Sequence, residues 1–73
     1  MLEVVLPSVL TKGKPETRVL EVGEEETPGS IINRLDMDAD IVNSVIADGS
    51  FISFSTPLGG VKRLVFLPHL GGG

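Results

Sequence analysis

The stretch "VKRLVFLPHLGGG", residues 61–73, closes the sequence and contains its longest apolar run. Residues 61–68 are apolar apart from Lys62 and Arg63, which is typical of a strand covered on at least one face. Pro68 ends this strand, because proline cannot donate to a sheet ladder. The three glycines that follow have no side chains and lose much entropy on ordering, so they add nothing to a core. The stretch predicts a central final strand followed by a bare tail.

The segment before this strand predicts a β-hairpin. An Asp48-Gly49 step stands between "SVIA" (44–47) and "SFISF" (50–54), and an Asp-Gly step between apolar segments is a strong hairpin signal. "STPLGG" (55–60) then predicts a turn that leads into the final strand.

The N-terminal part of the chain predicts a second hairpin. Residues 2–6 are rich in β-favouring side chains, and Pro7 interrupts them. A turn is expected at 11–16, where Gly13 and Pro15 stand, and a second strand at 17–22.

Between the two hairpins the pattern changes to that of a short helix at 28–35. Thr27 suits the N-cap, Pro28 suits the first helical position, and Ile31, Ile32 and Leu35 form one apolar stripe. The order of elements predicts an α+β domain: a mixed sheet of four to five strands, with the first and last strands central and one main helix packed across it.

Composition narrows the possible functions. With 73 residues the chain makes one domain with a thin core, and without cysteine it has no disulfide or thiolate site. A single His makes a metal site unlikely by count, and we expect none. The net charge of −4 argues against nucleic acid and anionic membranes as partners. No apolar run reaches the roughly 20 residues of a membrane span, and the N-terminal segment lacks the basic residues of a signal peptide, so we expect a cytoplasmic protein.

The order of elements, together with "VIADG" (45–49) and "LVFLPHLGGG" (64–73), resembles the ubiquitin-like sulfur carriers of the ThiS and MoaD types. The resemblance covers the whole chain. In that family a strand is usually followed by Asn-Gly, where this chain has Asp48-Gly49. The family often carries Leu-x-x-Gly-Asp before the last strand, where this chain has Leu58, Gly59 and Gly60 without the Asp, so the register of the last strand does not follow from the motif.

The resemblance implies a β-grasp (ubiquitin-like) domain at residues 1–70 and a flexible glycine tail at 71–73. It implies that a ubiquitin-activating-type adenylating enzyme couples the C-terminal carboxylate to AMP, using ATP. Sulfur from a sulfur donor then gives a thiocarboxylate. A downstream synthase or sulfur-acceptor enzyme uses that sulfur to make a cofactor of the molybdopterin or thiamine type, or another sulfur-containing metabolite. The resemblance then implies a carrier and not an enzyme, acting with partner enzymes either as a separate protein or as the small subunit of a synthase, with no permanently bound cofactor.

By the same resemblance the reactive group is the carboxylate of Gly73, or of Gly72 if the natural chain ends one residue earlier. Gly71 and Gly72 pass through the partner's narrow channel, where side chains would clash. Leu70, Pro68 and His69 are the remaining candidates for partner binding. For His69 an ordinary surface position is the default, because no carboxylate partner is visible in the sequence.

Two other functions stay open at this point. A ubiquitin-like modifier shares the adenylation step but ends in an isopeptide bond to a target lysine. A β-grasp interaction module is never activated at all. Loss of the last two glycines would abolish function in the carrier and the modifier and leave the interaction module unaffected.

Overall fold

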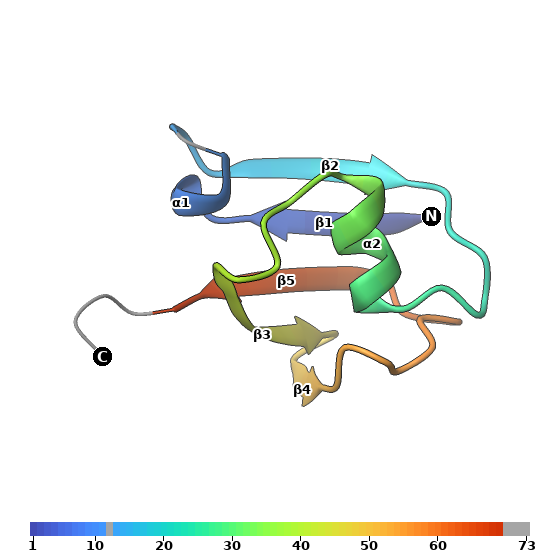
Figure 1. Cartoon of the computed structure of the whole chain (residues 1–73). Coiled ribbons are helices and arrows are strands. Elements are labelled where there is room, and N and C mark those ends of the chain that lie inside the picture. The colour runs from blue at the N-terminus through green and yellow to red at the C-terminus, as the bar shows by residue number, and fades with distance from the viewer. Residues whose placement is uncertain (12, 70–73) are drawn as a thin grey trace.

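The computed structural model describes residues 1–11 and 13–69, which form a sheet with one main helix. The elements follow one another as β1 (Leu2–Leu6), α1 (Ser8–Thr11), β2 (Glu16–Leu20), α2 (Pro28–Arg34), β3 (Val42–Ala47), β4 (Ser50–Ile52) and β5 (Arg63–Pro68). The strand order is β2-β1-β5-β3-β4, with β1 and β5 parallel and all other neighbours antiparallel. Figure 1 shows β5 in the middle of the sheet. This is a β-grasp arrangement, and it confirms the predicted fold class.

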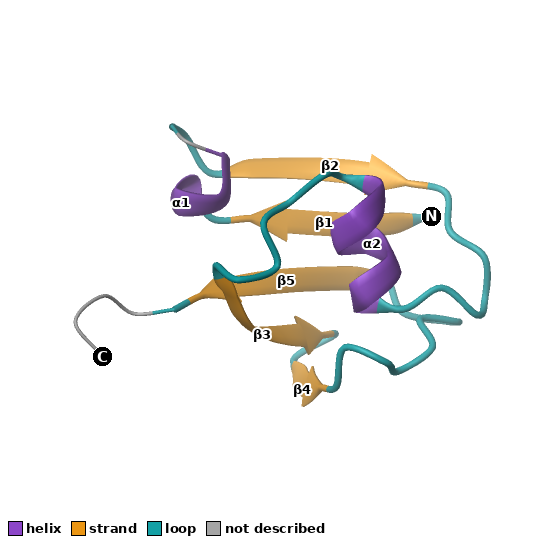
Figure 2. Ribbon diagram, viewed as in Figure 1, coloured by secondary structure: helices purple, strands orange, loops and turns teal. Residues whose placement is uncertain are grey.

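The helix α2 lies across one face of the sheet (Figure 2). The buried side chains of the strands point to this face and meet Ile31 and Ile32 of the helix. The core consists of Leu2, Val4, Leu6, Ile31, Ile32, Val42, Val45, Ala47, Leu58, Leu64 and Phe66. Phe66, on the central strand, is fully buried. The final strand therefore anchors the core, as its apolar run predicted.

Both ends of α2 are fixed by local hydrogen bonds. Thr27 is the N-cap: its Oγ1 accepts from the Ser30 amide at 3.1 Å, and Ser30 Oγ accepts from the Thr27 amide at 2.9 Å. At the other end Asp36 has a φ of 55°, and the Met37 amide donates to the Ile32 carbonyl at 3.0 Å. This is the Schellman pattern, which ends a helix and turns the chain sharply back.

Several predicted boundaries were wrong by one to three residues. The second strand was predicted at 17–22 but ends at Leu20, because Leu20 lies opposite Leu2, where β1 begins. The last strand begins at Arg63 instead of Val61, since Val61 still belongs to the preceding turn and donates its amide to the Leu58 carbonyl. The helical turn α1 was not predicted. Residues 53 and 54, assigned to a strand by sequence, lie beyond β4, and the carbonyl of Phe54 accepts from the Gly29 amide of α2.

The Asp48-Gly49 turn forms as predicted and also fixes the start of β5. Asp48 and Gly49 both have positive φ, 47° and 89°, as a type I′ turn requires. The Asp48 carboxylate accepts from the amide of Arg63 at 2.8 Å and from that of Lys62 at 3.1 Å. The Asp48 amide donates in turn to the Arg63 carbonyl at 2.9 Å. A single aspartate therefore holds the hairpin against the strand that leads to the C-terminus.

Replacement of Asp48 tests this link. We expect Asp48→Ala to lower the free energy of unfolding by about 2 kcal/mol, because it leaves two amides without their acceptor and places a Cβ-bearing residue without a local hydrogen bond at positive φ. Asp48→Asn keeps an acceptor oxygen and tolerates positive φ, so its loss should be less than half as large. Urea denaturation of both variants measures the difference. An unchanged free energy of unfolding in Asp48→Ala would show that the carboxylate contacts contribute nothing.

Candidate functional site

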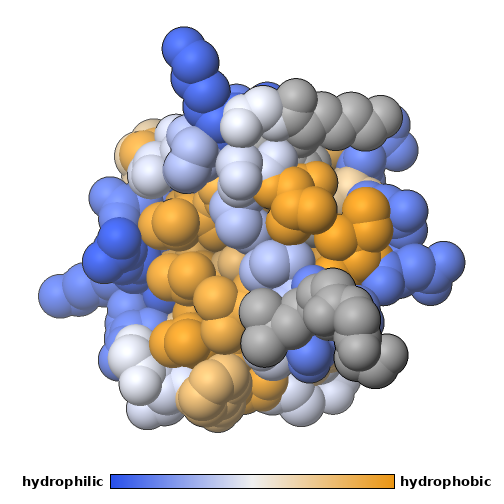
Figure 3. All heavy atoms as spheres, turned by 90° about the vertical axis from the view of Figure 1, so that its left-hand side faces the viewer, coloured by the Kyte–Doolittle hydropathy of each residue, from blue (hydrophilic) through white to orange (hydrophobic). Residues whose placement is uncertain are grey.

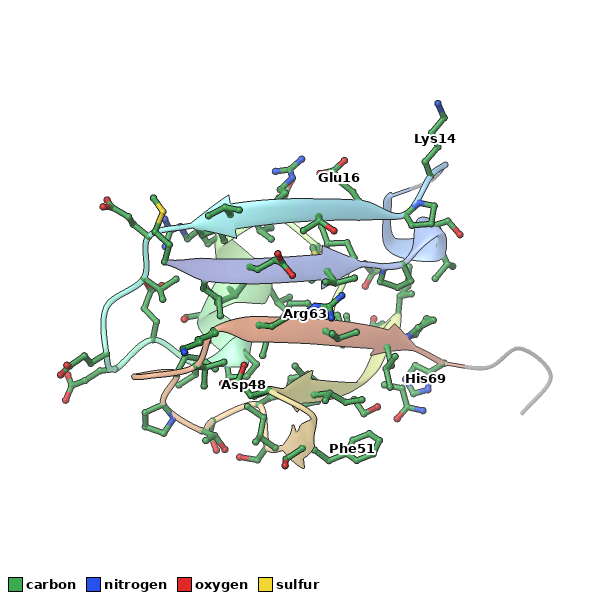
Figure 4. All side chains as sticks on the ribbon, turned by 180° about the vertical axis from the view of Figure 1, so that it is seen from behind. Lys14, Glu16, Asp48, Phe51, Arg63 and His69 are labelled. Atoms are coloured by element: carbon green, nitrogen blue, oxygen red, sulfur yellow. The ribbon has the colours of Figure 1, made fainter. Side chains whose placement is uncertain are left out.

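The candidate site lies at the end of the sheet where the central strand β5 finishes; we call this end of the strands the β5 edge. Pro68, the last residue of β5, lies opposite the buried Val42 of β3 and is itself half-buried. The next residue, His69, donates its backbone amide to the Ile41 carbonyl at 3.0 Å. Figure 4 shows His69 at the end of β5, at the opposite end of the strand from Asp48. The chain is thus held to the sheet as far as His69.

The sequence-predicted site residues divide into two groups. Pro68 and His69 are described: Pro68 is part of the sheet, and His69 is exposed. Leu70, Gly71, Gly72 and Gly73 lie outside the described residues, as does the proposed boundary between domain and tail. Their assignment as the reactive tail therefore stays a prediction.

The same edge also carries α1. Because β1 and β5 run parallel, the segments that follow them leave the sheet at the same edge, and α1 directly follows β1 (Figure 1). Val9 of α1 is 51% exposed. Figure 3 looks onto this edge and shows two groups of hydrophobic side chains separated by more polar ones. The edge at which β5 ends is thus partly hydrophobic on its surface.

The face of the sheet opposite α2 carries a line of apolar side chains that sequence analysis did not predict. Val5 of β1 pairs with Val65 of β5, Val65 pairs with Ile46 of β3, and Ile46 pairs with Phe51 of β4. Paired residues in neighbouring strands point to the same face. Alternation along β5 puts these four side chains opposite the buried Leu64 and Phe66. We call Val5, Val65, Ile46 and Phe51 the apolar row.

The apolar row is open to solvent. Phe51 is 71% exposed, while Val5, Val65 and Ile46 are half-buried by their neighbours in the sheet. Figure 4 views the sheet from this side, with no helix in front of the strands. Leu67 lies two residues after Val65 on the same face, so apolar surface continues along β5 toward His69. Large exposed apolar patches commonly mark interaction sites, so the apolar row is a candidate for one.

One signal in the sequence pointed to this surface. The final strand is apolar at consecutive positions, which fits burial on both faces, but a single short helix covers only one face. The partners Val5, Ile46 and Phe51 became evident only from the pairing of strands that are distant in sequence.

Charged groups border the row on one side. Glu3 and Arg63, paired across β1 and β5, form an ion pair with Nε and Oε1 3.0 Å apart. The side chains of Arg63 and Glu3 are 61% and 45% exposed, so the pair adds little stability.

Two further ion pairs lie elsewhere in the chain and join Arg18 to Glu16 and Arg34 to Glu26. All three arginines of the chain are thus paired with glutamates, within a chain of net charge −4.

No polar or charged side chain among the described residues is buried, and these residues contain no group of three or more His, Cys, Asp or Glu residues that could hold a metal ion. Within the same residues, no helix has the length and apolar character needed to cross a membrane. The site presents the backbone at the end of β5 beside an apolar surface.

Two substitutions at His69 separate its backbone from its side chain. His69→Pro removes the amide that donates to Ile41, and we expect it to lower the free energy of unfolding by about 1 kcal/mol. His69→Ala keeps the amide, and because the side chain is exposed its effect should stay within about 0.5 kcal/mol. Thermal or urea unfolding measures both. A larger loss for His69→Ala than for His69→Pro would contradict a purely backbone role in the fold.

Comparison with models of protein families finds no match to this chain, and comparison with curated proteins finds none either.

Proposed function

We propose that this protein is a ubiquitin-like sulfur carrier of the ThiS/MoaD type, which acts through its C-terminal glycine carboxylate. The observation that carries the proposal is the position of β5. This central strand leads from the core, past the apolar row, to the edge at which the sequence continues into Leu70 and residues 71–73. A β-grasp domain with this order of elements supports it.

In the proposed reaction a partner of the ubiquitin-activating type first adenylates the terminal carboxylate. A carboxylate oxygen attacks the α-phosphorus of ATP, and pyrophosphate leaves. Hydrosulfide supplied by a sulfur donor then attacks the acyl carbon, AMP leaves, and loss of the sulfur-bound proton gives the thiocarboxylate. In this proposal the nucleophilic and acid–base groups belong to the partner enzymes.

The apolar row supplies the binding energy that such a tail needs. Ordering three glycines in a channel costs on the order of 3–6 kcal/mol. Full burial of one large apolar side chain contributes about 1.5–3 kcal/mol. Burial of Phe51 and its neighbours against the adenylating enzyme would offset the cost of ordering the tail. The net negative charge favours a basic rim on that enzyme, which mainly speeds encounter, so association should slow at high salt.

Removal of Gly72 and Gly73 tests the role of the tail. We expect the shortened protein to keep its fold and to lose ATP-dependent adenylation, because the reactive carboxylate no longer reaches the catalytic centre. Mass spectrometry after incubation with a candidate adenylating enzyme, ATP and a sulfur donor gives the readout, with full-length protein as the control. Adenylation that persists in the shortened protein would exclude the carrier. Conjugation of the full-length protein to lysines, without thiocarboxylate, would instead identify a modifier.

Substitution in the apolar row tests whether the row docks to the adenylating enzyme, separately from the role of the glycine tail. Phe51→Ser should lower kcat/KM for adenylation by about tenfold or more, because it removes the most exposed anchor of the row while leaving the core intact. Val19→Ser is the matched control: Val19 is 59% exposed and lies on the same face outside the row, so kcat/KM should stay within about twofold. Equal losses in both variants would contradict docking through the row.

A further inference from the structure

A second surface feature lies on the opposite side of the sheet from the apolar row. It is a pocket of about 310 Å³ between α2, the start of β3 and the residues after β4. Its lining consists of Gly29, Ile32, Asn33, Ala39, Val42 and Phe54. Asn33 is the one polar side chain in this lining, so the pocket combines apolar walls with a single hydrogen-bonding group. Ligand sites commonly have this composition, and the volume is at the lower end of their range.

The pocket is a built feature of the fold. Its floor is formed by Ile32 and Val42, both in the buried core. Gly29 lets α2 approach the residues after β4 closely: its amide donates to the Phe54 carbonyl at 3.0 Å, and a Cβ added at Gly29 would lie 3.3 Å from that oxygen. The Schellman turn at the end of α2 reverses the chain, and the residues after it bring Ala39 into the lining of the pocket.

The segment that supplies Ala39 to the pocket is rich in aspartate. Ala39 stands between Asp38 and Asp40, and Asp36 precedes them, all three aspartates being exposed. No lysine or arginine occurs between Leu35 and Ala47. The nearest basic residue before this segment, Arg34, is already paired with Glu26 at 3.1 Å. None of the ion pairs described above involves Asp36, Asp38 or Asp40.

We propose that this pocket binds a segment of a partner protein in which an apolar side chain is flanked by basic residues. The apolar side chain fills the space between Ile32, Val42 and Phe54, and Asn33 bonds the backbone of the segment. The basic residues meet the carboxylates of Asp38 and Asp40. Because the pocket and the apolar row lie on opposite faces, both can be occupied at once. The inference does not depend on activation of the tail.

Titration of ¹⁵N-labelled protein with short blocked peptides tests the proposal. The first probe has a leucine between pairs of basic residues, the second has glycine in place of that leucine, and the third has acidic residues in place of the basic ones. We expect the first peptide to shift the amide signals of Ile32, Asn33 and Val42. Loss of the leucine should weaken binding at least about tenfold, and the acidic peptide should not bind.

Variants locate the binding site. Asp38→Asn with Asp40→Asn should weaken the first peptide about threefold to tenfold. The asparagine side chain introduced at position 38 would still accept the bond that Asp38 Oδ1 receives from the Asp40 amide at 2.9 Å, so the turn is kept. Ala39→Phe, at an exposed position, should block the pocket and abolish the dependence on leucine. The matched control, Glu24→Gln with Glu25→Gln, removes the same charge elsewhere on the exposed surface and should leave the affinity unchanged.

Three results would overturn the proposal. They are equal binding of the basic and acidic peptides, equal weakening by the aspartate and glutamate variants, and shifts at Val65 and Ile46 of the apolar row instead of at the pocket. None of these results bears on adenylation. A negative peptide titration therefore leaves the sulfur-carrier proposal unaffected, and a negative adenylation assay leaves the pocket proposal unaffected.

Discussion

The parallel pairing of β1 with β5 is the constraint on which the rest of the structure depends. Val4 lies beside Leu64, and Val5 beside Val65, although about sixty residues separate them in sequence. A parallel pair needs a crossover, and the connecting chain supplies α2, which covers one face. The same pairing sends β5 out of the sheet beside α1. The central position of β5 and its exit at the same end of the sheet as α1 are therefore two consequences of one strand pairing.

The sheet is apolar on both faces, but its helix covers only one. On the covered face Leu64 and Phe66 complete the core, and on the other face Val65 joins the apolar row. In a chain of this size the core is thin, and leaving apolar side chains on an open face costs stability that could have come from burial. The docking role that we propose for the row would account for that cost, because binding of a partner would bury the same side chains. The pocket beside α2, next to which Asp38 and Asp40 stand in the sequence, is proposed as a second contact surface of different chemistry.

Sequence patterns predicted the parts of the fold that local chemistry decides. Thr27 and Pro28 marked the start of α2, and Asp48-Gly49 marked the hairpin, because caps and tight turns depend on single side chains. The end of β2, the helical turn α1 and the apolar row were missed. The end of β2 and the row follow from register between distant strands. Of the predicted site, Pro68 and His69 are placed, and the tail assignment still rests on the resemblance of the sequence ending.

The central claim is that the terminal glycine carries sulfur, and the intact mass of the protein isolated gently from its own host tests it most directly. The account predicts a species heavier by the difference between one sulfur and one oxygen, with the added mass on the C-terminal peptide. A terminal carboxylate alone, both in the host protein and after incubation with an adenylating enzyme, ATP and a sulfur donor, would contradict the account. That result would leave the ubiquitin-like modifier and the plain interaction module, and a ladder of larger conjugates in the same sample would identify the modifier.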